Sequence, residues 1–214
     1  MTQFSIIFLL ILCADSGLKL WLNLRQKHAI HKSFNQVPVP FDQHITLEEH
    51  QKAARYNLAK LTENRYELAY SALLVLIFTL GGGIDWIAQS FNLANYPLTS
   101  EVLLIVIYTL LNSLLALPFS YYSTFKIEQR FGFNNTTLKL FIVDLIKGTL
   151  LGLVIGVPLL YLVMWLMNNL GNQWWLWVWG VLVVFNLLIL IIYPTFIAPL
   201  FNKFTPLEDL ELKA

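Results

Sequence analysis

The sequence predicts an all-α, polytopic membrane protein, as its composition and its long apolar runs indicate. Hydrophobic residues make up 57% of the 214-residue chain, charged residues make up 13%, and the mean hydropathy is +0.62. Soluble domains are about half apolar and about one quarter charged. A helix needs about 20 residues to cross the hydrocarbon, and the runs do not alternate as barrel strands do. We expect a membrane helical bundle of five transmembrane helices plus a cytoplasmic amphipathic helix, with spans near residues 3–23, 68–91, 101–121, 142–167 and 174–197.

The first run is interpreted as a membrane span rather than a cleaved signal peptide. It lacks a basic start, and its apolar stretch continues past Asp15 and Lys19 to Leu22. No convincing small-residue cleavage site follows it, and Leu12 precedes Cys13 where a lipoprotein site requires a small residue. Asp15 and Lys19 are one helical turn apart, so we expect them to form an ion pair.

The distribution of basic residues predicts the orientation of the bundle. The connection between the first two runs is rich in Lys and Arg, whereas residues 92–100 and 168–173 contain neither. Cytoplasmic loops carry the excess of Lys and Arg. The N-terminus is therefore expected outside and the C-terminus in the cytoplasm. An aromatic belt at the outer end of the last run fits this orientation, with Trp174, Trp175, Trp177 and Trp179.

The first long connection is expected to contain the cytoplasmic amphipathic helix. Thr46 and Glu49 have the spacing of a capping box. Apolar residues then recur at helical intervals, at Leu47, Ala54, Leu58 and Leu61. The other side of this helix is expected to be solvated and basic, with Lys52, Arg55 and Lys60. Such a helix packs against the bundle or lies on an anionic membrane surface.

The same connection contains one group of residue types that bind metals, namely His44, Glu48, Glu49 and His50. The zincin motif H-E-x-x-H is absent, and Thr46 stands where the inverted motif requires its first histidine. No third ligand completes a catalytic zinc site. We therefore predict no metal-ligating residue and no catalytic residue in this chain.

The second run contains one glycine signal, and the third run is followed by another. Gly81-Gly82-Gly83 beside Asp85 lacks the Lys-Ser/Thr tail of a phosphate loop, and Asp85 is expected near the outer interface. The third helix is expected to continue past Pro118 and to end at Gly132, a residue typical of a left-handed C-cap. Asn134 then turns the chain into the fourth helix.

The fourth run combines an expected ion pair with an expected packing groove. Asp144 and Lys147 are three residues apart near the membrane entry and are expected to pair. Glycines every fourth residue favour close helix approach, at Gly148, Gly152 and Gly156. Pro158 is expected to kink this helix because its freed carbonyl needs another partner.

No nucleophile elbow, phosphate loop or dinucleotide fingerprint occurs in the sequence. Nothing predicts a nucleic-acid partner. The residues by themselves therefore do not indicate a particular reaction.

Three segments together carry a family resemblance. They read L-E-E-H-Q-K-A-A-R-Y at 47–56, F-K-I-E-Q-R-F-G-F-N at 125–134, and Y-P-T-F-I-A-P-L-F-N-K-F-T-P-L at 193–207. This combination resembles the N-terminal membrane portion of the type-1 CAAX prenyl protease family, integral-membrane zinc metallopeptidases. The first segment is similar to bacterial members, which implies a bacterial inner membrane.

The resemblance implies seven membrane helices around a water-filled chamber. It also implies a zinc site held by an H-E-x-x-H helix and a later glutamate, with the motif glutamate activating water. In the family those residues follow the last run found here, so no catalytic or zinc-binding residue is carried over, and the cofactor zinc is expected only in the full-length protein. Residues 1–204 are expected to form the N-terminal transmembrane domain and residues 205–214 to begin the missing peptidase domain.

The resemblance implies that the chain supplies chamber wall and substrate access and is inactive alone. The expected partners are the lipid bilayer, the missing C-terminal peptidase domain and a peptide or membrane-protein substrate. Position alone predicts which side chains brace the peptidase domain or face the substrate. They are Glu128, Arg130, Asn134, Asp144 and Lys147.

Two other functions are compatible with the residues alone. A stand-alone, non-catalytic five-helix membrane adaptor or scaffold would need no further helices. A small transporter is less well supported, because transporters usually show paired repeats with broken helices and the sequence shows no internal repeat.

Overall fold

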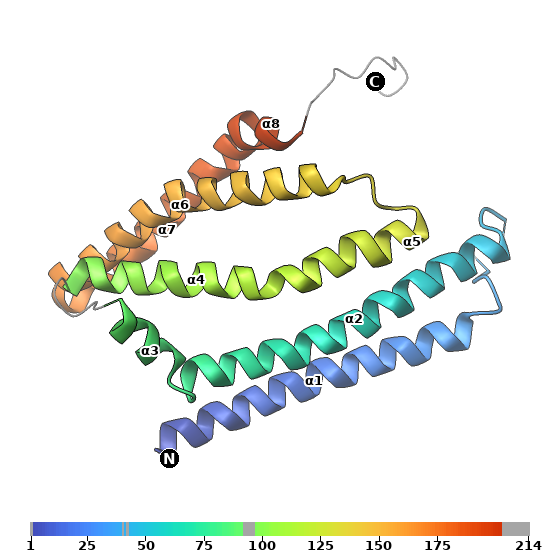
Figure 1. Ribbon diagram of the computed structural model, residues 1–214, viewed down its shortest axis with the longest axis horizontal. Coiled ribbons are helices and arrows are strands. Elements are labelled where there is room, and N and C mark those ends of the chain that lie inside the picture. The colour runs from blue at the N-terminus through green and yellow to red at the C-terminus, as the bar shows by residue number, and fades with distance from the viewer. Residues whose placement is uncertain (1, 40, 42, 92–96, 203–214) are drawn as a thin grey trace. The chain divides into compact units, whose positions relative to one another are not determined.

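The computed structural model describes residues 2–39, 41, 43–91 and 97–202, and within them it contains helices and no strand (Figure 1). Four helices are long and apolar enough to cross a membrane, and a bent helix pair supplies a fifth candidate span. The prediction of a helical membrane bundle is therefore confirmed. The expected start of a peptidase domain at residues 205–214 lies outside the described residues.

The described chain forms two compact units. The first contains α1 (Gln3–Ser33), α2 (Leu47–Thr79), α3 (Gly83–Ser90), α4 (Pro97–Tyr122) from Ile107 onward, the π-helical η2 (Ser123–Glu128) and α5 (Gln129–Phe131). The second contains α4 up to Val106, α6 (Leu138–Asn169), η3 (Gly171–Gln173), α7 (Trp174–Ile192), the π-helical η4 (Tyr193–Ile197) and α8 (Ala198–Phe201).

In the first unit, α1 and α2 lie side by side as a helical hairpin (Figure 1). The buried Asn23 of α1 joins them: its Nδ2 donates to the Leu61 carbonyl at 2.9 Å and to Asn64 Oδ1 at 3.3 Å. Near the connection between the two helices, His50 Nε2 lies 2.8 Å from the Ser33 carbonyl oxygen. The predicted Asp15–Lys19 ion pair of α1 is confirmed at 2.7 Å.

The predicted capping box starts α2. Thr46 Oγ1 accepts from the Glu49 N–H at 3.3 Å, and the Glu49 carboxylate accepts from the Thr46 N–H at 2.9 Å. The expected amphipathic helix is not a separate element, because α2 runs without a break from Leu47 to Thr79. Its 33 residues are about 50 Å long at 1.5 Å per residue, which exceeds the hydrocarbon thickness. The first turns of α2 therefore extend beyond the membrane core.

The predicted span at 68–91 is not one helix, because α2 and α3 meet at an angle of 56°. Gly82 has φ +77°, a left-handed conformation that glycine adopts without strain. A Cβ atom on Gly81 would lie 2.6 Å from the Ile77 carbonyl oxygen, and one on Gly83 would lie 2.9 Å from Phe78 Cα. The glycine triplet therefore permits a close bend at the end of the span.

The helix that starts with α4 continues past Pro118 through η2 and α5, as predicted. Its end is also as predicted, because Gly132 adopts φ +81° as a left-handed C-cap. The π-helical turn at Ser123–Glu128 was not predicted. In a π-helix the backbone hydrogen bonds span five residues, so the side-chain positions after Ser123 are shifted relative to an α-helix.

In the second unit, α6 packs against α7, and α6 continues through Pro158 to Asn169. Among the described residues, no neighbouring helix packs into the predicted glycine groove of α6. A Cβ atom on Gly148, Gly152 or Gly156 would have no heavy atom within 4 Å. These glycines therefore do not mediate close packing inside this unit.

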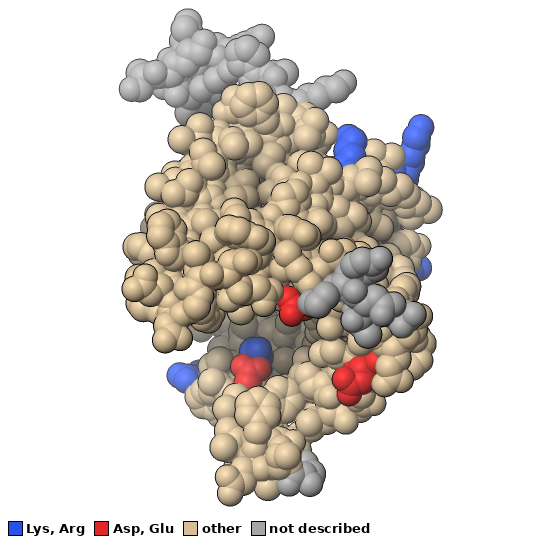
Figure 2. All heavy atoms as spheres, turned by 90° about the vertical axis from the view of Figure 1, so that its left-hand side faces the viewer, with Lys and Arg blue, Asp and Glu red and all other residues tan. Residues whose placement is uncertain are grey.

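Large apolar side chains cover much of the described surface. Leu190 is 73% exposed and Val154 is 71% exposed, as expected when lipid rather than water surrounds the helices. Figure 2 shows one face on which uncharged residues predominate and Lys, Arg, Asp and Glu are scattered. These features agree with an integral membrane protein.

Candidate functional site

Two cavities lie beside α2 in the first unit, one against the α4–η2–α5 segment and one against α4, Ser123 and Gln26 of α1. The larger cavity has a volume of about 610 Å³ and is mainly apolar, with Leu58, Phe119 and Ile127 among its lining residues. The second, of about 560 Å³, is more polar and includes Asn57, Asn64 and Ser120. Glu63 and Phe119 line both cavities.

Lys60 is the centre of an ionic network between these helices. Its Nζ lies 3.5 Å from Glu63 Oε2 on α2 and 3.7 Å from Glu128 Oε1 at the end of η2. Lys60 also donates a hydrogen bond to Ser123 Oγ. Only 6% of the Glu63 side chain is exposed, compared with 34% for Lys60 and 33% for Glu128. One ammonium group therefore faces two carboxylates in a partly desolvated position.

The π-helical turn accounts for two contacts of this network. Ser123 and Glu128 are the first and last residues of η2, and they are separated by the five-residue interval of a π-helical hydrogen bond. Both therefore reach the same lysine on α2. The prediction of a solvated basic face for Lys60 was wrong, because tertiary packing against η2 supplies its partners.

Three of the five predicted site residues belong to the first unit and have separate environments. Glu128 pairs with Lys60. Arg130 lines the larger cavity, and its Cζ lies 5.7 Å from the centroid of the Phe131 ring. Asn134 Oδ1 accepts from the Thr136 N–H at 2.6 Å in the turn before α6.

The other two predicted site residues, Asp144 and Lys147, lie on α6 in the second unit, and they do not form the expected ion pair. Lys147 Nζ instead donates to the Leu200 carbonyl of α8 at 3.0 Å. Asp144 Oδ1 is buried without a hydrogen-bond partner in the described structure. The expected pairing was wrong because the lysine side chain reaches the carbonyl of a sequence-distant helix.

The candidate metal residues have other roles in the structure. His50 contacts the Ser33 carbonyl, and Glu49 caps α2. The two hydrogen bonds from Thr46 to the Glu49 carboxylate lower the pKa of Glu49 below its ordinary value. Across residues 2–39, 41, 43–91 and 97–202, no group of three or more His, Cys, Asp and Glu side chains is arranged to hold a metal ion.

Sequence reasoning did not find the cavities or the Asn23 contact. The three-residue spacing of Lys60 and Glu63 is a signal of a local pair. Glu128 is distant in sequence, and no local pattern connects it to Lys60. Asn23 lies at the end of an apolar run, where a buried asparagine indicates a hydrogen-bonding neighbour.

The fold and the inward-facing polar side chains define a polytopic α-helical membrane protein with cavities between its helices. The family model of the CAAX prenyl protease N-terminal region, described as five membrane helices, matches residues 26–203. The chain therefore belongs to the CAAX prenyl protease family and corresponds to its N-terminal membrane part.

Similar proteins cover nearly the whole chain. The CAAX prenyl protease 1 homolog of Caenorhabditis elegans is 34% identical over 98% of this chain and 47% of that protein. The homolog of Dictyostelium discoideum is 35% identical over 97% of this chain and 50% of that protein. The crystal structure of S. mikatae Ste24p matches with a TM-score of 0.88 and 30% identity, covering 100% of this chain and 51% of that one. The chain thus spans about half the length of these relatives.

Proposed function

We propose that the chain provides the chamber wall and substrate access of a zinc-dependent endopeptidase of the CAAX prenyl protease type that cleaves a peptide or membrane-protein substrate. The observation that carries this proposal is the match to CAAX prenyl proteases over nearly the whole chain. The H-E-x-x-H motif does not occur in the 214 residues. Zinc and the water-activating glutamate are therefore assigned to the remainder of the full-length protein.

Polar side chains at membrane depth support the role as a chamber wall. A further cavity of about 310 Å³ in the first unit is lined by Glu67, Ser71, Asn112 and Ser113. Polar groups in a membrane protein are costly against lipid and normally face a partner or a hydrated cavity. The facing polar stripes of α2 and α4 provide such a lining.

We assign a bracing or substrate-facing role to Glu128, Arg130, Asn134, Asp144 and Lys147. Two observations support different parts of this assignment. Arg130 borders a cavity, and Asp144 Oδ1 is buried without a hydrogen bond from the described residues, so it is available to a donor on another segment. We also propose a membrane domain at 1–204 and the beginning of the peptidase domain at 205–214.

The proposed location is the bacterial inner membrane, with the N-terminus outside and the C-terminus in the cytoplasm. The distribution of Lys and Arg supports the orientation. The resemblance of residues 47–56 to bacterial members supports the membrane, although the curated relatives reported above are eukaryotic.

The proposed activity is tested by extending the reading frame beyond codon 214. We expect the extended product to contain H-E-x-x-H, to bind one zinc ion per chain and to cleave a farnesylated CAAX peptide. The purified 214-residue chain is expected to do neither, and a motif-glutamate variant of the extended product is the inactive control. An immediate stop codon, without such a motif in the adjacent gene, would contradict the enzyme proposal and favour the adaptor function.

A further inference from the structure

We propose that the 610 Å³ cavity between α2 and the α4–η2–α5 segment binds one anionic phospholipid from the bilayer. The cavity lies within the volume range of about 300–1,000 Å³ that is typical of small-molecule sites. The proposal goes beyond the function proposed above, because it requires neither zinc nor peptide cleavage.

The position of the cavity along the helices matches the edge of the membrane. The helix formed by residues Leu98–Phe131 is 34 residues long, or about 51 Å at 1.5 Å per residue, so it extends well beyond about 30 Å of hydrocarbon. The cavity begins at Pro118, inside the predicted span that ends near 121, and reaches Phe131 beyond it. It therefore crosses the boundary between the lipid tails and the headgroups.

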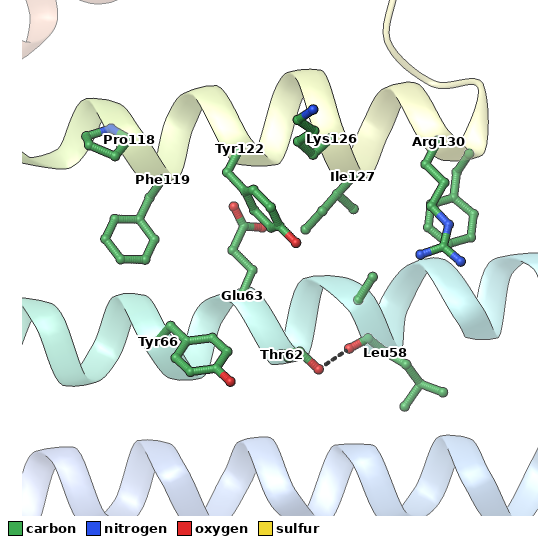
Figure 3. A pocket seen from close by; sticks show the side chains of 12 residues that line it. Leu58, Thr62, Glu63, Tyr66, Pro118, Phe119, Tyr122, Lys126, Ile127 and Arg130 are labelled. Atoms are coloured by element: carbon green, nitrogen blue, oxygen red, sulfur yellow. Dashed lines mark hydrogen bonds between the residues drawn. The ribbon is translucent and has the colours of Figure 1, made fainter.

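The side chains change character along this direction. At the membrane end the lining includes Pro118 and Phe119, and at the other end it includes Arg130. Figure 3 shows Phe119, Ile127 and Arg130 directed from the α4–η2–α5 segment toward α2. An acyl chain is complementary to the apolar end, and a phosphate group is complementary to the guanidinium. Basic pockets between membrane helices are typical sites for anionic headgroups.

Two tyrosines place the rim of this cavity in the interfacial region. Tyr66 on α2 is 70% exposed, and Tyr122 at the end of α4 is 52% exposed. Tyrosine is enriched where lipid meets water, because its ring is apolar and its hydroxyl is polar. These exposed fractions show that the cavity has an accessible rim through which a lipid can enter.

The acidic side chain of the cavity does not cancel this complementarity. Glu63 lines the cavity, and its carboxylate shares Lys60 Nζ with that of Glu128, so this network keeps one net negative charge. The two cations that line the cavity, Lys126 and Arg130, outweigh that charge. Figure 3 shows the Lys126 side chain turned away from α2. Arg130 is therefore the residue assigned to the headgroup.

The test is a titration of the purified 214-residue chain in neutral detergent with short-chain phosphatidylglycerol or phosphatidylcholine, read by native mass spectrometry. We expect saturable one-to-one binding of phosphatidylglycerol. Arg130→Gln is expected to weaken it about five-fold, the effect of one basic side chain on an anionic lipid, and Arg130→Lys is expected to retain most of it. Arg55→Gln is the matched control, because Arg55 is exposed and outside the cavity lining.

A second variant tests the cavity itself. Ala59 lines the cavity, and Ala59→Phe is expected to reduce binding of phosphatidylglycerol at least ten-fold by filling the space for the acyl chain. Circular dichroism and thermal unfolding establish that each variant is folded. If Arg130→Gln does not fold, the proposal is tested by the relative affinity of the wild-type chain for phosphatidylglycerol and phosphatidylcholine. Equal binding of the two lipids overturns the proposal.

Three further outcomes would also overturn the proposal. One is equal phosphatidylglycerol binding by Arg130→Gln and Arg55→Gln. Another is complete displacement of the lipid by millimolar inorganic phosphate, which would indicate a simple anion site. The third concerns a farnesylated peptide that binds saturably to the wild-type chain and not to Ala59→Phe. If phosphatidylglycerol does not compete with this peptide, the cavity is a substrate site.

Discussion

At the scale of single residues, Lys60 makes contacts with η2 that local sequence patterns did not predict. Its ammonium group lies within 4 Å of two carboxylates, one of which is almost fully buried. Buried charges are costly when they lose their partner, even though the intact pair adds little net stability. The network therefore favours one arrangement of α2 against η2, since other arrangements leave Glu63 uncompensated.

Replacing Lys60 by Met is expected to destabilise the first unit. Complete removal of one partner from a fully buried pair costs roughly 3–5 kcal/mol. We expect about 2 kcal/mol here, because solvent reaches Lys60 and Glu128 and screens part of the effect. The measurement is reversible unfolding in mixed micelles, followed by circular dichroism.

The matched controls for this prediction are a double variant and an exposed arginine. Lys60→Met combined with Glu63→Gln is expected to recover part of the lost stability, because the buried charge is removed together with its partner. Arg55→Gln removes one exposed positive charge and is expected to have little effect. A Lys60→Met variant as stable as Arg55→Gln would show that the network does not contribute.

The first turn of α2 is expected to become less protected at acidic pH. The Thr46 hydrogen bonds lower the pKa of Glu49 below its ordinary value, so the ionised form stabilises the folded helix start. This contribution is complete above the ordinary pKa and is lost as the pH falls through the lower folded pKa. Hydrogen exchange of residues 47–51 measures the effect.

Thr46→Ala tests the physical cause of this pH dependence. It removes the hydroxyl bonds of the cap, at a cost of about 1 kcal/mol, and is expected to increase exchange at neutral pH and to weaken the acid-induced increase. Thr99→Ala is a suitable reference, because Thr99 is exposed on α4, away from this turn. An unchanged pH profile in Thr46→Ala would argue against the assigned role of the cap.

At the scale of elements, two helix irregularities shape the first unit. The bend between α2 and α3 depends on glycines with close backbone neighbours. The π-helical turn η2 brings Ser123 and Glu128 to the same side as Lys60. Hydrophobic run length identifies a span but contains no information about either irregularity, because both arise from backbone geometry.

Alanine substitutions at two glycines are expected to have different effects on stability. Gly81→Ala places Cβ 2.6 Å from the Ile77 carbonyl oxygen, so the backbone must shift, at an expected cost of about 1–3 kcal/mol. Gly148→Ala on α6 meets no heavy atom within 4 Å and is expected to be neutral or to stabilise by up to about 1 kcal/mol through helix propensity. Thermal unfolding of the two variants provides the comparison, and equal effects would contradict the close-bend interpretation.

At the scale of the whole molecule, the described chain contains four to five candidate spans. An odd number of crossings places the two ends on opposite sides of the membrane. The proposed orientation follows from the basic connection between α1 and α2 and from the neutral connection between α6 and α7. Both connections contain exposed residues that can be labelled, Gln36 and Asn172.

The orientation is testable by cysteine labelling in intact cells. In a Cys13→Ala background, Asn172→Cys is expected to react with a membrane-impermeant maleimide, and Gln36→Cys is expected to react only after the membrane is permeabilised. Labelling of denatured protein controls for thiol reactivity. The reverse labelling pattern would invert the proposed orientation. Labelling of both sites in intact cells would place them on the same side of the membrane and would contradict an odd number of crossings between them.

The sequence by itself determined the helical membrane class, the capping box at Thr46 and the C-cap at Gly132. These features depend on run length and on residues within a few positions of one another, so local patterns contain the necessary information. Only the tertiary structure decided the partners of Lys60, Asn23 and Lys147. Those contacts join residues distant in sequence, and they form only when packing brings two helices within hydrogen-bonding distance.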